Sequence, residues 1–159
     1  WNRSIIVPRS HALAKLENIK LEDVAKYPIV TYVFGFTGRS RLDRAFERKK
    51  LSPNVVFTAT DSDVIKTYVK LGLGVGIIAR MACKDLDEEV VAIDASHLIE
   101  PSVTYIGFRK GTYLKSYMYE FIRSFAPHLT RSVIEEYMCI PNSEARKIYF
   151  DTTKLPFSC

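Results

Sequence analysis

The sequence predicts an α/β fold with a mainly parallel β-sheet that is covered by helices on both faces. In residues 3–93, β-branched apolar runs alternate with segments of helical spacing, and such alternation requires crossover connections between parallel strands. The loops between these segments have ordinary lengths. The composition, 47% hydrophobic, 26% charged and 12% aromatic, is typical of a globular domain and excludes disordered, collagen-like and disulfide-dense chains.

The expected elements follow from periodicity and from glycine and proline punctuation. Strands are expected at residues 3–8, 29–32, 55–60, 75–79 and 90–93, helices at 21–25, 39–50 and 63–71, and a loop at 11–16. After a break at residues 100–102, we expect a strand at 103–108 and helices at 113–125 and 132–137.

The strand expected at 103–108 has no obvious partner in the preceding segment. It either extends the first sheet or belongs to a second sheet whose other strands lie elsewhere. The polar stretch from residue 141 to 159 is expected to be irregular, and either mobile or docked on a partner.

Charge is distributed unevenly along the chain. The 23 basic and 18 acidic residues give a net charge of +5, which permits a nucleic-acid partner without requiring one. Residues 37–50 are mostly basic and residues 84–100 mostly acidic. We interpret these as two solvated faces, one on a helix and one on a later loop.

Several functional classes lack their signals. No apolar run is long enough to span a membrane. The three cysteines form no C-x-x-C pair, so reduced thiols in the cytoplasm are expected. The three histidines lie outside any metal motif and are read as surface residues, and no nucleophile elbow is present. An enzyme, a metal or a cofactor is therefore not expected. The chain begins without Met or a signal peptide, which suggests a fragment or a processed product.

Glycines at positions 72, 74 and 76 resemble the dinucleotide-binding fingerprint only loosely. They follow an expected helix and precede an expected strand, the reverse of the order that a phosphate-binding turn requires. We interpret them as a helix C-terminal cap and a closely packed entry into a strand.

The turn FGFTGRS, residues 34–40, does have the order strand, glycine turn, helix. The unpaired N–H groups and the dipole of a helix N-terminus attract anions. Thr37 falls at the capping position, and Gly35 and Gly38 allow close approach to the backbone. Arg39 and Arg41 add positive charge if they face inward. Alternatively, Thr37 simply caps its own helix.

The next expected helix begins after Asp61, at the end of the following strand. Its acidic residues could receive an ammonium group, so the two helix starts together would suit a zwitterion such as an amino-acid derivative. Ordinary N-capping is the alternative. Trp1 could donate its indole N–H to an anion or pack over an acyl group, or it could be buried at a junction.

Three segments together resemble the effector-binding domain of LysR-type transcriptional regulators, in particular those that activate cysteine biosynthesis and sulfonate use. They are TYVFGFTGRSRLD (31–43), VFTATDSDVIKTYVKLGLGVGIIA (56–79) and IGFRKGTYLKSYMYEFIRSFAPHLT (106–130). The resemblance implies a periplasmic-binding-protein-like (type 2) fold of two lobes with the effector in the cleft. Residues 1–100 would form the second lobe, 101–131 would complete the first, and 132–159 would be the C-terminal tail.

The resemblance also implies the ligand and the partners. The effector would be N-acetylserine or O-acetylserine, with sulfate or thiosulfate as competing anion. Thr37, Gly38 and Trp1 carry over as ligand contacts, whereas Arg39 and Asp61 are inferred from charge alone. Family members are cytoplasmic homotetramers whose effector domains pair; they bind DNA through a winged-helix domain absent here, and RNA polymerase is a possible partner. The competing hypothesis is an anion-binding lobe of a periplasmic solute-binding protein.

Overall fold

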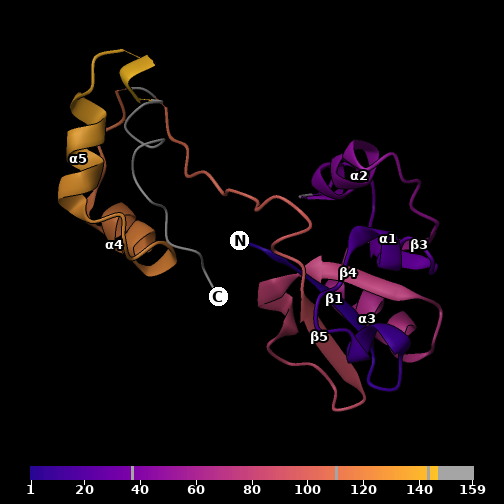
Figure 1. Cartoon of the computed structure of the whole chain (residues 1–159). Coiled ribbons are helices and arrows are strands. Elements are labelled where there is room, and N and C mark those ends of the chain that lie inside the picture. Colours follow the sequence, from indigo (N-terminus) through magenta and orange to yellow (C-terminus); the bar gives the residue numbers. More distant parts are fainter. Residues whose placement is uncertain (37, 110, 143, 147–159) are drawn as a thin grey trace. The chain divides into compact units, whose positions relative to one another are not determined.

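The computed structural model describes residues 1–36, 38–109, 111–142 and 144–146. The chain divides into two compact units, Trp1–Val103 and a second unit from Thr104 onward, which Figure 1 colours along the sequence. The elements of the first unit are β1 (Arg3–Pro8), η1 (Ala12–Lys15), α1 (Leu21–Val24), β2 (Ile29–Tyr32), α2 (Arg39–Arg48), β3 (Val55–Ala59), α3 (Ser62–Lys70), β4 (Val75–Ala79), η2 (Arg80–Cys83) and β5 (Val90–Asp94). The second unit contains α4 (Ser116–Phe125) and α5 (Arg131–Cys139).

The five strands form one sheet in the order β3-β2-β4-β1-β5. β2 is parallel to both β3 and β4, but β1 lies antiparallel between β4 and β5. The expected mainly parallel sheet is therefore correct for β2, β3 and β4 and wrong for the pairings of β1. The link from β1 to β2 contains only short helices, the four-residue η1 and α1, whereas parallel strands are usually joined through a longer crossover helix.

Helices cover both faces of the sheet, as predicted. On one face, side chains of α1 and α2 pack with Ile5 and Val7 of β1, and on the other, Ile65 and Val69 of α3 pack with Ile6. These side chains are almost completely buried. The alternation along β1 places successive residues on opposite faces, so this strand contributes to both halves of the core.

The glycine-rich segment behaves as the sequence predicts. α3 ends in a Schellman motif: Gly72, with φ of 79°, donates to the carbonyl of Val69 at 2.9 Å, and the next N–H, that of Leu73, donates to Tyr68 at 3.0 Å. Gly76 lies inside β4, where any side chain would meet Ile6 and Val69. Both glycine roles are structural.

The second unit departs from the expectations. Residues 103–108 form no strand, and α4 begins at Ser116, three residues later than expected. Without a neighbouring strand to pair its N–H and C=O groups, the apolar run stays irregular. α5 is longer than the expected 132–137.

The apolar face expected on α4 is only partly covered. Ile122 is buried with Leu114 and Ile134, whereas Tyr117 and Phe121 are 67% and 66% exposed. A core of three buried residues is too small to cover the whole helix face.

Two further expectations concern the loop at residues 11–16 and the domain boundaries. A short 3-10 helix, η1, lies within residues 11–16, where a loop was expected. The division at residues 100 and 131 stays a prediction, and residues 147–159 of the expected tail lie outside the described part. Within that part, no helix has both the length and the apolar character to cross a membrane.

Substituting Gly76 should destabilise the first unit. In Gly76→Ala the new methyl would lie 2.7 Å from Val69 Cγ2 and closer still to Ile6, and such overpacking costs about 1–3 kcal/mol. Gly107→Ala is the control, because nothing lies within 4 Å of its Cβ position; its effect should stay within about 0.5 kcal/mol. Urea unfolding measures both, and equal stability of the two variants would contradict the close packing of β4.

Candidate anion-binding site

The turn between β2 and α2 ends in a glycine cap. Gly38 is the N-cap of α2 with φ of 97°, and its carbonyl accepts from the N–H groups of Arg41 and Leu42 at 3.2 Å. The expectation that Thr37 occupies the capping position is therefore wrong, because the helix begins one residue later; Thr37 itself lies outside the described residues. The first turn of α2 contains no acidic residue, so its positive dipole end keeps its attraction for an anion.

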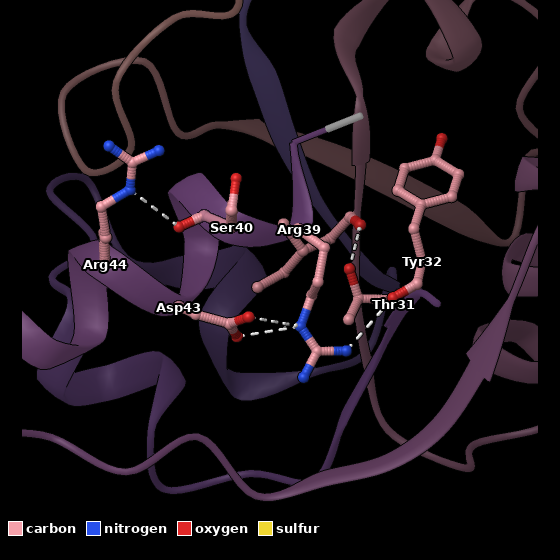
Figure 2. Close-up of polar contacts among 7 residues, drawn as sticks. Thr31, Tyr32, Arg39, Ser40, Asp43 and Arg44 are labelled. Carbon is pink, nitrogen blue, oxygen red and sulfur yellow. Dashed lines mark hydrogen bonds and ion pairs between the residues drawn. The ribbon is translucent and has the colours of Figure 1, made fainter. Parts of the chain in front are cut away.

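Arg39 connects the start of α2 to the end of β2. Its Nε donates to the Asp43 carboxylate at 2.8 and 3.1 Å, and Nη1 donates to the Tyr32 carbonyl at 3.2 Å (Figure 2). The side chain is 14% exposed. Its charge is thus partly balanced by Asp43, and its observed contacts restrain the turn. A direct contact between Arg39 and a ligand stays a prediction.

Arg3 brings two of the predicted site residues together. Its guanidinium lies over the Trp1 ring, with Cζ 4.9 Å from the ring centroid. It also lies directly against Gly38: a Cβ there would be 2.5 Å from Arg3 Cζ and would overlap Nη2. On a third side, Nη2 donates to Ser102 Oγ at 3.1 Å. Trp1 and Gly38 therefore share one neighbourhood.

The sequence analysis missed Arg3. The residue is only 2% exposed, and its pKa is lowered to about 10 by burial, then by the positive charge of Arg41, with Tyr32 acting in the opposite direction. It remains charged at neutral pH. The available signal was a charged residue opening a strand that the pattern places in the core, since arginines are rarely so buried without a partner.

Asp61 lies at the same edge of the sheet. Tyr32 pairs with Ala59 across parallel strands β2 and β3, so α2 and α3 both start at this edge. Asp61 caps α3, accepting from the Asp63 N–H at 2.6 Å, which confirms the N-capping alternative. Its role toward a ligand ammonium stays a prediction.

Tyr32 lies between these groups. Its hydroxyl accepts from the Ala79 N–H at 3.4 Å. Burial is the main cause that raises its pKa; the nearby charge of Arg3 opposes this rise, and that of Asp61 adds to it. The charges of both Arg3 and Asp61 therefore act on the Tyr32 hydroxyl.

A cavity of about 740 Å³ lies along another side of α2. Its cationic lining includes Arg41, Arg48 and Lys49. Arg41 and Arg48 pair with Glu100, and Lys49 pairs with Glu22. Of the acidic stretch 84–100, Glu100 thus pairs with the basic helix, and the cations that line this cavity are partly compensated by Glu22 and Glu100.

The histidines and cysteines can be compared with the surface histidines and reduced thiols that the sequence predicts. His97 is exposed, as expected, and its Nε2 lies 2.9 Å from the Ile19 carbonyl oxygen. Cys83 and Cys139 are free thiols; Cys159 lies outside the described residues. In the described part of the chain, no cluster of three His, Cys, Asp or Glu residues could hold a metal ion.

The contact between Gly38 and Arg3 can be tested by matched substitutions. Gly35 and Gly38 both have positive φ, 87° and 97°, but only Gly38 faces a neighbour. Gly35→Ala and Gly38→Ala should share the backbone cost, and Gly38→Ala should lose about 1–3 kcal/mol more through overlap with the guanidinium. Thermal or urea unfolding decides; equal losses would show that Arg3 does not occupy this space.

The chain matches the family model described as "LysR substrate binding domain" over residues 1–130. It is 54% identical over 155 residues to the HTH-type transcriptional regulator CysB of Haemophilus influenzae, covering 98% of this chain and 48% of that protein. It is 49% identical over 135 residues to the regulator SsuR of Burkholderia cenocepacia, covering 84% and 44%. The chain therefore spans about half the length of these relatives.

A solved structure agrees. The cofactor-binding domain of the Cbl transcriptional regulator matches with a TM-score of 0.79 and 37% identity, over 89% of this chain and 62% of that one. These relatives are transcriptional regulators rather than enzymes, and the match supports the periplasmic-binding-protein-like type 2 fold. By sequence and by fold, the chain belongs to the LysR substrate-binding domain family and is related to CysB, SsuR and Cbl.

Proposed function

We propose that this chain is the ligand-sensing part of a transcriptional activator of sulfur assimilation and cysteine biosynthesis. Its effector is N-acetylserine or O-acetylserine, with sulfate or thiosulfate as a competing anion. The observation that carries the proposal is the amino end of α2: a glycine cap, a first turn without acids, and the cation of Arg3 against the cap. Positive dipole and positive side chain converge where an anion would rest.

Each part of the effector has a suitable neighbour in this proposal. The carboxylate of N-acetylserine, or sulfate, accepts hydrogen bonds near Gly38 and Thr37. The acetyl group requires apolar surface, and Phe34 and Phe36, in the same turn, are 82% and 49% exposed. Trp1 contributes an aromatic edge beside Arg3. Where O-acetylserine is the ligand, its ammonium has Asp61 as an acceptor.

Regulation follows from differential binding. An effector shifts the population of domain arrangements only by the difference in its affinity for them, and a coupling of about 1–3 kcal/mol changes a partner's affinity by roughly 5–150-fold. The partners proposed are a second effector domain, a tetrameric assembly in the cytoplasm, DNA contacted through a winged-helix domain outside this chain, and RNA polymerase. A periplasmic solute-binding role is not favoured, because the relatives reported above are regulators.

Calorimetry should detect the effector directly. N-acetylserine and sulfate are each expected to bind the full-length protein with one-site behaviour, and saturating sulfate should weaken N-acetylserine binding, because both place an anion at the same helix N-terminus. Serine of the same configuration, which lacks only the acetyl group, is the matched comparison ligand. Absence of heat with either anion would contradict the proposed function, and independent binding of both would contradict a shared site.

The role predicted for Thr37 can be measured in a reporter strain. Thr37→Ala should shift the induction midpoint to about ten-fold or higher inducer concentration, since a hydrogen bond to a charged group contributes about 1.5–3 kcal/mol. Thr67→Ala is the matched control, because its hydroxyl donates to the Asp63 carbonyl within α3. Superimposable induction curves for Thr37→Ala and the wild type would remove Thr37 from the site.

A further inference from the structure

Arg3 has an unsatisfied nitrogen in a nearly closed environment. The residue is 2% exposed, yet Nη1 is buried and has no hydrogen-bond partner among the described residues. Leaving a charged donor buried and unpaired is costly. A native protein that keeps such a donor has a reason to do so, and hydrogen bonding to a ligand is one such reason.

Among the described residues, no acidic side chain pairs with Arg3. Of the charged groups that affect its pKa, Arg41, a second cation, has the largest effect. The acids that might have served are engaged: Glu100 pairs with Arg41 and Arg48. Asp43 is held by Arg39. The positive charge at this point is therefore not balanced.

The backbone beside Arg3 adds to the excess of positive charge at this point. Gly38 caps α2, and the guanidinium occupies the space that a side chain at position 38 would fill. A capping side chain is thus replaced by a cation, although a helix N-terminus is stabilised by an oxygen acceptor or an anion. The Arg3 guanidinium and the positive end of the α2 dipole lie directly against each other, an arrangement that a bound oxyanion would stabilise.

We infer that Arg3 is a direct ligand of the effector's anionic group, with Nη1 donating to one of its oxygens while Nη2 stays bonded to Ser102. This inference rests on the proposed function and adds a residue to it. Sulfate and the carboxylate of N-acetylserine share the required oxyanion chemistry, since a guanidinium donates to both in a fixed, planar geometry. Ser102 is a positioning residue: its hydroxyl fixes one side of the fork so that Nη1 points away from it.

The test compares the wild type with Arg3→Met and Arg3→Gln in the full-length protein. Isothermal titration with sulfate and with N-acetylserine should give at least ten-fold weaker binding of both in each variant. Arg44→Met is the matched control: it also removes one positive charge, from an exposed position of α2 where Arg44 Nε donates to the Ser40 carbonyl (Figure 2). Its affinity should change less than two-fold.

Thermal unfolding gives a second readout that a merely structural arginine would not produce. The midpoint of each variant without added anion serves as its own baseline, because Arg3→Met removes both a buried unpaired donor and the hydrogen bond to Ser102. Adding sulfate should raise the midpoint of the wild type and of Arg44→Met, and leave that of Arg3→Met almost unchanged. Arg3→Gln keeps a donor for Ser102 and covers the case in which the methionine variant does not fold.

The possible outcomes separate the two proposals. Weak binding confined to the Arg3 variants supports the inference. Anion affinities like those of the wild type in either folded Arg3 variant would overturn it while leaving the proposed function intact. A wild-type protein that binds neither anion would defeat the proposed function first, and this inference with it.

Discussion

A guanidinium buried at the first residue of β1 is the constraint on which the arrangement of the first unit depends. Arg3 is enclosed by Trp1, Ser102 and the cap of α2, so three segments distant in sequence have to meet around one charge. The requirement for glycine at position 38 follows from this, since the left-handed backbone and the guanidinium both exclude a side chain. The charge is tolerated because it lies at an edge of the sheet rather than among its apolar faces.

Helix α2 has two sides with opposite electrostatic character. Along the cavity, Arg41 and Arg48 pair with Glu100, and Lys49, the residue after the helix, pairs with Glu22; exposed pairs of this kind contribute little to stability. At its amino end, the buried Arg3 guanidinium against the cap has no acidic partner among the described residues. The buried side chains of Leu42 and Phe46 anchor this ten-residue helix to the domain. The same separation explains why overall net charge was a poor guide to the site.

The sequence predicted those features that depend on local patterns. Short β-branched apolar runs identified all five strands of the sheet, and the position of the glycines after a helix and before a strand distinguished a helix cap from a phosphate loop. The direction of β1 and the absence of a strand at 103–108 depend on distant partners, which periodicity does not report. Arg3 was missed for the same reason: its hydrogen-bond partner, Ser102, is 99 positions away. Gly38 and Trp1 were named as ligand contacts because a family resemblance supplied long-range information; both lie against Arg3, and their contact with a ligand stays a prediction.

The position of β1 limits where the domain can bend. The strand is paired on both edges, with β4 from Arg3 to Ile6 and with β5 from Ser4 to Pro8, so it cannot slide without breaking two ladders. A displacement of the guanidinium would therefore act on the peptide units at Trp1 and Ser102. The Ser102 N–H donates a hydrogen bond to the Trp1 carbonyl at 2.8 Å. A second hydrogen bond, from the Trp1 nitrogen to the Ser102 carbonyl at 2.6 Å, completes this link, so these two bonds join the segment that ends at Ser102 to the doubly paired strand.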